Sequence, residues 1–379
     1  MSGPLQGVKV VEIAGIGPGP FCAMLLADLG AEVVRVDRAG EAGKAPGGVD
    51  VMNRSRPSIA VDLKNPRGAE VILGLVEHAD ALVEGFRPGV AERLGIGPEP
   101  CLARNPKLVY GRMTGWGQTG PYATMPGHDM NYIALSGALG SIGRRGELPV
   151  PPLNLVGDFG GGGMLLAFGI LAGVLHARAT GEGQVVDAAM TDGSALLMTL
   201  IYGMQGSGLW AGGRGENLLD GGAPFYDTYA AADGPISIAG LEPQFHAAML
   251  QVMGIDDVDP ATQYDPATWP AMRERLAAEL RTRTRTEWED LFAGTEVCIA
   301  PVLTMDEAPD HAHNVARETF ADVGGIVQPA PAPRFSATPP AVPTPPPVAG
   351  ADTVATLTAW GFAGGDVDDL LEAGAIRQA

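Results

Sequence analysis

The sequence is poor in cysteine, in positive charge and in long apolar runs, and each shortage excludes a class of protein. Its three cysteines, Cys22, Cys101 and Cys298, are widely separated, match no zinc-binding spacing and cannot all pair with one another. Because 25 Lys and Arg face 44 Asp and Glu, the formal net charge is −19, which argues against nucleic-acid binding by the whole surface. The longest strongly apolar stretch, residues 164–175, contains glycines and is too short to span a bilayer.

These shortages also indicate where the protein works. The first residues have neither a basic region nor an apolar segment, so we expect no secretory signal. Few cysteines are typical of a reducing compartment, and we expect a cytoplasmic protein without membrane insertion. A chain of 379 residues, of which 46% are hydrophobic, predicts a globular protein with two domains and a large core.

The N-terminal half alternates short β-branched runs with helical patterns. Residues 8–13 predict a strand, 14–20 a turn, 21–29 a helix and 31–36 a second strand. Further strands are expected at 58–62, 81–84 and 107–112, with a helix from Pro66 that Asn65 would cap. This order predicts a parallel sheet covered by helices.

The first turn partly matches a dinucleotide-binding fingerprint. Gly15 and Gly17 occupy the first two glycine positions, and Asp37 follows near the place of a ribose-binding acid. Pro20 occupies the third glycine position, which argues against nicotinamide binding.

Basic residues gather at the ends of the expected strands, where a doubly wound sheet binds its ligands. They are Arg38, Arg54, Lys64, Arg87 and Arg93. Arginine suits phosphate geometry, so Arg38 and Arg93 are candidate phosphate contacts. The alternative is that these side chains only keep an acidic protein soluble.

A histidine and a carboxylate each open an apolar segment in the middle of the chain. His128 holds a proton near neutral pH, and Asp158 could do so if burial raised its pKa. They form a candidate acid/base pair. Residues 160–163 are all glycine, so backbone N–H groups there could face a developing oxyanion. The ordinary alternative for both residues is a helix N-cap.

The C-terminal half is less regular. We expect helices at 159–178 and 192–204, a strand at 184–188, a linker at 206–224 and a small α+β unit that includes a strand at 235–239 and a helix at 269–280. Residues 286–289 resemble a capping box. His311 and His313 lack a third ligand, so no metal site is expected. Residues 328–350 are dense in proline and should be irregular, and the tail from 351 predicts a short acidic helix.

Four segments, 113–121, 127–129, 155–158 and 183–187, strongly resemble the family III CoA-transferase superfamily. The histidine before Asp129 resembles its α-methylacyl-CoA racemase branch. The resemblance runs from about residue 3 to about residue 340. It implies that His128 and Asp158 are the catalytic bases and that Glu242 contacts the histidine, although Glu242 could equally be an N-cap before Pro243.

The resemblance also implies a coenzyme A site. Its residues would be Arg38, Val61, Asp62, Leu63, Lys64, Gly85, Phe86, Arg87, Arg93, Gly127, Asp129, Met130, Asn131 and Tyr132. The expected fold is α/β, with a Rossmann-like parallel-sheet large domain and a smaller α+β domain, in an interlocked homodimer where Glu242 would act in trans. The expected bounds are 1–205 for the N-terminal part of the large domain, 206–224 for the linker, 225–305 for the small domain and 306–379 for the return segment and tail.

The implied activity is interconversion of 2R and 2S 2-methylacyl-CoA thioesters through an enolate. It needs no cofactor, because coenzyme A is part of the substrate. The alternative is CoA transfer between carboxylic acids with Asp158 as the nucleophile. His128 favours the racemase, since transferases of this family usually carry a non-basic residue at that position.

Overall fold

The computed structural model describes residues 2–379, apart from the side chain of Val49, and divides the chain into two compact units. The first contains residues up to 136, 153–197 and 318–379, and the second contains 137–152 and 198–317. The second unit therefore takes up residues 198–224, which had been expected in the large domain and the linker, together with 137–152.

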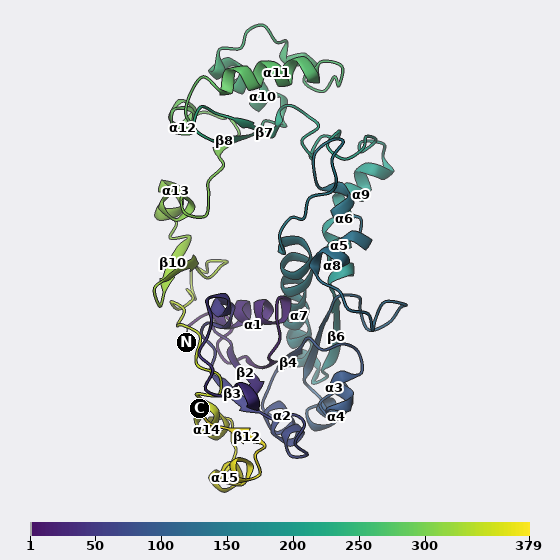
Figure 1. Cartoon of the computed structure of the whole chain (residues 1–379), viewed down its shortest axis with the longest axis vertical. Helices are drawn as coiled ribbons and strands as arrows, with labels where there is room; N and C mark the ends of the chain where they lie inside the picture. Colours follow the sequence, from purple (N-terminus) through teal and green to yellow (C-terminus); the bar gives the residue numbers. More distant parts are fainter. Residues whose placement is uncertain (1) are drawn as a thin grey trace. The chain divides into compact units, whose positions relative to one another are not determined.

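A seven-stranded sheet forms the centre of the first unit, in the order β12-β3-β2-β1-β4-β5-β6. All neighbouring pairs are parallel except β12, which runs antiparallel to β3. The strands are β1 (Lys9–Ile13), β2 (Glu32–Arg38), β3 (Ser58–Val61), β4 (Ala81–Glu84), β5 (Val109–Thr114), β6 (Gln184–Ala189) and β12 (Ile376–Arg377). The predicted parallel-sheet α/β fold is confirmed (Figure 1).

Helices cover both faces of this sheet, which is why successive valines in the middle of β1 and β2 are both buried. Val10 and Val33 pack in one core cluster with α1 (Pro18–Asp28) and α7 (Leu165–Thr180), whereas Val11 and Val34 pack in another with α2 (Gly68–Val76). Alternate residues of one strand point to opposite faces, so each strand contributes to both clusters. The unit also contains α3 (Val90–Arg93), α4 (Pro98–Arg104), α5 (Asp129–Leu135), α8 (Met190–Leu197), α14 (Thr353–Ala359), α15 (Gly364–Glu372) and the hairpin β10 (Phe320–Val323) and β11 (Ile326–Pro329).

The second unit has its own core around a three-stranded antiparallel sheet. Its strands are β7 (Tyr226–Ala230), β8 (Pro235–Ala239) and β9 (Ile299–Pro301). Its helices are α6 (Ala138–Ser141), α9 (Thr199–Gly206), α10 (Pro243–Met253), α11 (Trp269–Leu280), α12 (Arg285–Phe292) and α13 (Ala312–Ala316). The core contains Phe225, Leu276 and Trp288, all of them fully buried.

Three local predictions were wrong in detail. The helix expected from Pro66 begins at Gly68 and has Arg67 rather than Asn65 at its N-cap position. The helix expected at 192–204 is two helices, α8 and α9. The capping box lies two residues earlier than expected, because the Thr284 hydroxyl accepts from the Glu287 N–H while Glu287 accepts from the Thr284 N–H.

Residues 155–180 form one continuous helical stretch, because a π-helical segment, η3 (Leu155–Met164), runs directly into α7. By length and composition alone this stretch could cross a membrane, and 44% of its most apolar window is buried inside the structure. The core helix of a soluble protein meets the same criterion, so this is weak evidence for a membrane span. From sequence, the apolar run of 164–175 was judged too short to span a bilayer. The helical stretch in the structure is longer because η3 adds residues 155–164 to α7.

Candidate active site

The carboxyl ends of four parallel strands meet at one edge of the sheet and carry most of the predicted site. β2 ends at Arg38, β3 at Val61 and β4 at Glu84. β5 ends at Thr114 and continues into residues 115–116. In open parallel sheets this is the edge where ligands bind.

A cavity of about 690 Å³ opens at this edge. Its walls come from the β1–α1 loop, the segment after β4, the segment after β5 and the start of α5. His128 and Asp158 both line it, together with Arg38, Phe86 and Arg87. The structure therefore brings the two candidate bases and part of the candidate CoA site into one cavity, and all of the lining residues belong to the first unit.

His128 stands at the N-cap position of α5, with extended backbone angles. Its backbone N–H donates to the Asn131 side-chain oxygen at 3.0 Å, which fixes the start of the helix without using the imidazole. The imidazole itself is exposed and faces the cavity. The N-cap alternative for this residue is thus correct for the backbone and leaves the side chain free for chemistry.

Asp158 lies on the π-helical turn of η3, a rare geometry that is frequent at functional sites. Its carboxylate accepts a hydrogen bond from the Asn154 side chain at 2.7 Å. Partial burial raises the pKa of Asp158 above its ordinary value of 3.8, and the nearby Asp129 acts in the same direction. The Asn154 hydrogen bond and His128 act against this shift. A carboxyl group in this position holds a proton more readily than an exposed aspartate does.

Asp129 connects the two candidate bases. It follows His128 in the chain, is only 5% exposed, and accepts the backbone N–H of Asp158 at 2.6 Å. Its carboxylate packs so closely on Gly157 that a Cβ there would overlap it. Because the Asp158 N–H is donated to Asp129, it is not available to an enolate oxygen.

The expected cations divide into free and paired groups. Arg38, Lys64, Arg87 and Arg93 are exposed, and none forms an ion pair within the described residues 2–379. Arg54 is different, since it is 3% exposed and bonded to Asp28 at 2.6 Å. Arg54 therefore differs from the other basic residues near the strand ends, because its charge is already neutralised within the fold.

The remaining residues of the expected CoA site lie at the same edge with differing exposure. Gly85, Gly127 and Tyr132 line the cavity, whereas residues 61–64, Arg93, Met130 and Asn131 do not. Tyr132 is buried, donates its hydroxyl hydrogen to the Gly127 carbonyl and packs edge-on against Trp116 with ring centroids 4.7 Å apart. Its contacts are therefore those of a residue that shapes the wall.

One charged group of the site was missed from the sequence. Glu84 ends β4, is fully buried, and accepts the Phe86 N–H at 2.6 Å and the Arg112 side chain at 3.1 Å. Burial raises the pKa of Glu84 to about 7, and these hydrogen bonds act against that rise. Arg112 also forms an ion pair with Glu92, in which a guanidinium nitrogen lies 2.8 Å from a carboxylate oxygen. An acidic residue at the end of an otherwise apolar strand was the signal that could have revealed it.

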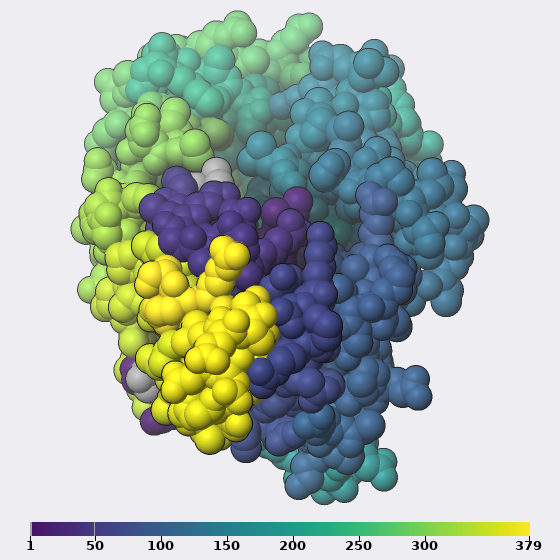
Figure 2. Space-filling view, turned by 60° about the horizontal axis from the view of Figure 1, so that its bottom comes forward, coloured from purple at the N-terminus to yellow at the C-terminus, as the bar shows by residue number. Residues whose placement is uncertain are grey.

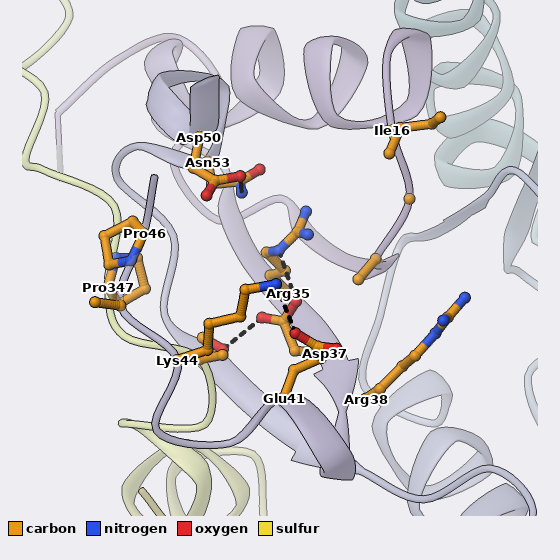
Figure 3. A pocket seen from close by; sticks show the side chains of 15 residues that line it. Ile16, Arg35, Asp37, Arg38, Glu41, Lys44, Pro46, Asp50, Asn53 and Pro347 are labelled. Atoms are coloured by element: carbon orange, nitrogen blue, oxygen red, sulfur yellow. Dashed lines mark hydrogen bonds and ion pairs between the residues drawn. The ribbon is translucent and has the colours of Figure 1, made fainter. Parts of the chain in front are cut away.

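Figure 3 shows a smaller cavity of about 320 Å³. It adjoins the first cavity, because Ala14, Gly15, Ile16 and Arg38 line both. Asp37 lines this cavity, but both of its oxygens are engaged: one accepts from Arg35 at 3.1 Å and the other from Ser58 at 2.6 Å. The Asp37 carboxylate is thus occupied by hydrogen bonds within the sheet, whereas a ribose-binding carboxylate needs an oxygen that is free to accept from the ribose hydroxyls. This adds to the argument from Pro20 against a dinucleotide site.

Glu242 belongs to the second unit, where it is exposed at the N-cap position of α10 and its carbonyl accepts from the His246 N–H at 3.0 Å. Its side chain makes no capping bond. His311 is bonded to Glu289 at 2.9 Å. Within residues 2–379, no group of three or more His, Cys, Asp or Glu side chains is arranged to hold a metal ion.

Fold and site together define an α/β protein with exposed cations at the ligand-binding edge of its sheet and a histidine–carboxylate pair in one cavity. Residues 5–353 match the family model described as CoA-transferase family III. The chain is 46% identical over 362 residues to "Alpha-methylacyl-CoA racemase" of Mus musculus, which covers 94% of this chain and 93% of the relative. It is 42% identical over 382 residues to the protein of that name from Homo sapiens, covering 98% and 99%.

Among solved structures, a CAIB/BAIF family protein from Brucella suis superposes with a TM-score of 0.81 at 24% identity, covering 95% of this chain and 100% of that one. This likeness shows the fold. The chain belongs to CoA-transferase family III, and the resemblance inferred from its motifs is confirmed.

Proposed function

We propose that this protein is an α-methylacyl-CoA racemase that interconverts the 2R and 2S forms of 2-methyl-branched acyl-CoA thioesters. The observation that carries the proposal is that His128 and Asp158 line one cavity at the ligand-binding edge of the sheet. The 46% and 42% identical relatives bear the racemase name over nearly their whole length, which supports it.

The chemistry follows from two groups that can each hold a proton. The thioester acidifies the hydrogen on C2, one base removes it, and the resulting enolate takes a proton from the other group on its opposite face. His128 serves one face and Asp158 the other. The raised pKa of Asp158 suits this role, because a carboxyl group that keeps its proton can deliver it to the enolate.

The nucleotide and diphosphate of coenzyme A would bind to four cations near this strand edge, Arg38, Lys64, Arg87 and Arg93, which are exposed and form no ion pair within residues 2–379. Guanidinium groups suit phosphate because they donate two parallel hydrogen bonds. A net charge of −19 would repel an anionic ligand elsewhere on the surface, so a local group of free cations directs it to this edge.

We further propose that the protein works as an interlocked homodimer. On the first unit, Met164, Phe168 and Leu175 of η3 and α7 expose 56%, 70% and 71% of their surface. Apolar exposure of this extent marks an interaction surface, and a second copy of the chain is the proposed occupant. In such a dimer Glu242 of the partner subunit would contact His128 and hold its imidazole.

Two further proposals complete the function. No metal or redox cofactor takes part, since coenzyme A belongs to the substrate. The protein is cytoplasmic, which the three free cysteines, two of them buried, support.

The test is incubation with (2S)-2-methylacyl-CoA in deuterated buffer without an acid acceptor, following deuterium at C2 and the 2R/2S ratio. Wild-type protein should incorporate deuterium at C2 and convert the 2S form into a mixture of 2R and 2S. Because no metal takes part, it should do so even after dialysis against a metal chelator. His128→Ala and Asp158→Asn should each lower epimerisation by about 10²-fold to 10⁴-fold. His313→Ala and Asp366→Asn, which change exposed residues of the same types, are the matched controls. Near wild-type epimerisation by either folded active-site variant would refute the assignment.

The same assay separates the racemase from a transferase. If no exchange occurs but CoA moves to an added free carboxylic acid, Asp158 acts as a nucleophile and the proposal fails. Co-expression of His128→Ala with Glu242→Ala tests the trans arrangement. Random pairing of two inactive chains gives one intact site in half of the dimers, hence about a quarter of wild-type activity. No recovery would place Glu242 in cis, and an active Glu242→Ala homodimer would place it outside catalysis.

A further inference from the structure

The C-terminal segment, residues 344–379, returns to the sheet beside the candidate nucleotide site. Its last part extends beyond residue 353, where the family match ends. There it forms α14, α15 and the short strand β12, which is one helix and one strand more than the sequence predicted. Figure 2 shows this segment, in yellow, packed directly against the purple and blue N-terminal part of the first unit.

β12 completes the edge of the sheet at β3. Ile376 pairs with Val61 and Arg377 pairs with Ala60. Two further hydrogen bonds continue past the strand into the loop that carries Lys64: the Asp62 N–H donates to the Ala375 carbonyl at 2.8 Å, and the Asn65 side chain donates to the Ala373 carbonyl at 2.8 Å. The backbone of residues 60–65 is therefore held by the tail along its outer side.

The beginning of the same segment holds a second loop of the site. The Gly43 N–H donates to the Ala349 carbonyl at 2.9 Å, and the Ala349 N–H donates to the Lys44 carbonyl at 3.1 Å. Pro347 and Ala349 line the smaller cavity, and Pro347 lies across it from Arg38 at the end of β2 (Figure 3). One continuous segment thus holds the loop after β2 and the loop after β3.

Packing makes this attachment rigid. Leu357, Trp360 and Ile376 are buried in the same core cluster as Val61 and Leu75. Phe362 lies over Gly74 of α2, where a Cβ would come within 2.6 Å of the ring. A loop with such an anchor loses less conformational freedom when it binds a ligand, so its cations contribute more to affinity.

We propose that residues 373–379 are a positioning element for the nucleotide end of coenzyme A: they order residues 61–65 so that Lys64 and its neighbours meet the nucleotide. The inference rests on the proposed function and adds the tail to its site. The tail acts through the loop, and touches neither His128 nor Asp158. Its loss should therefore weaken nucleotide binding without slowing proton transfer.

Two variants test this. Asn65→Ser removes the donor to the Ala373 carbonyl and keeps an oxygen that can accept from the Arg67 N–H, which Asn65 accepts at 3.0 Å. The second variant ends at Ala375 and lacks β12. The control is Val367→Ala, which removes buried apolar contact from α15 and none of the hydrogen bonds between the tail and the loop. Each is assayed with a 2-methylacyl-CoA and with the matching acyl-pantetheine thioester, which lacks the nucleotide.

We expect both test variants to raise KM for the CoA thioester and Kd for free CoA by about tenfold, with kcat and acyl-pantetheine turnover nearly unchanged. Val367→Ala should lower Tm and leave these constants alone. Equal losses with both thioesters, or unchanged CoA affinity in Asn65→Ser, would overturn the inference. If the shortened chain does not fold, Asn65→Ser decides. A wild-type protein that binds no CoA would refute the proposed function instead.

Discussion

Replacement of Asp129 by alanine should slow epimerisation because Asp129 holds Asp158 in place relative to His128. The variant removes the acceptor of the Asp158 N–H, a hydrogen bond of 2.6 Å beneath the cavity. An unsatisfied buried N–H costs about 1–3 kcal/mol. If this loss appears fully in the transition state, the rate falls by about 5-fold to 150-fold, since 1.4 kcal/mol corresponds to a factor of ten.

The assay is deuterium exchange at C2 measured separately from the 2R and the 2S thioester, with Tm recorded for each variant. Asp129→Asn keeps an oxygen that can accept the N–H, so it should recover most of the rate lost in Asp129→Ala. The close contact with Gly157 leaves little room for a water to replace the carboxylate. Wild-type exchange in folded Asp129→Ala would refute the positioning role, and equal impairment of both variants would show that charge matters instead.

Three other predictions concern stability. Burial raises the pKa of Glu84 from 4.5 to about 7, so its stabilising contribution is present below pH 4.5 and lost as pH rises through 7. This contribution is about 3 kcal/mol of the free energy of unfolding, and Glu84→Gln should flatten the change of Tm with pH across this range. Burial lowers the pKa of His246 from 6.5 to about 4, so the protein loses stability as pH falls from 6.5 toward 4. Neither ring nitrogen has a hydrogen-bond partner within the described chain. His246→Leu should therefore raise the free energy of unfolding by about 1–3 kcal/mol, measured by chemical denaturation at neutral pH. A Cβ at Gly193 would overlap the Gly161 carbonyl, so Gly193→Ala should lower the free energy of unfolding by at least about 3 kcal/mol or prevent folding. The control is Gly203→Ala, which has open space around it and should change Tm little or raise it. A stable, active Gly193→Ala protein would contradict the close contact between Gly193 of α8 and Gly161 of η3.

Local pattern was enough to predict several elements from sequence. The strand expected at 235–239 and the helix expected at 269–280 have those bounds in β8 and α11. Such elements are determined by neighbouring residues, whose apolar spacing selects strand or helix before any distant contact forms. The helices at 159–178 and 192–204 were less well placed, because packing between η3 and α8 requires glycines that are open to several conformations.

By itself, the sequence determined that the protein is an acidic α/β member of its family, with His128 and Asp158 as candidate bases, since these follow from residue types and motif order. Tertiary structure alone decided which charged residues are paired inside the fold and which remain open to a ligand. Arg54 and Arg38 look alike in sequence, yet one is neutralised by Asp28 while the other faces the ligand edge. The Asp129 bond to Asp158, the burial of Glu84 and the closure of β3 by β12 likewise join residues far apart in the chain. Hydrogen bonds and burial depend on which segments meet, and local pattern does not contain that information.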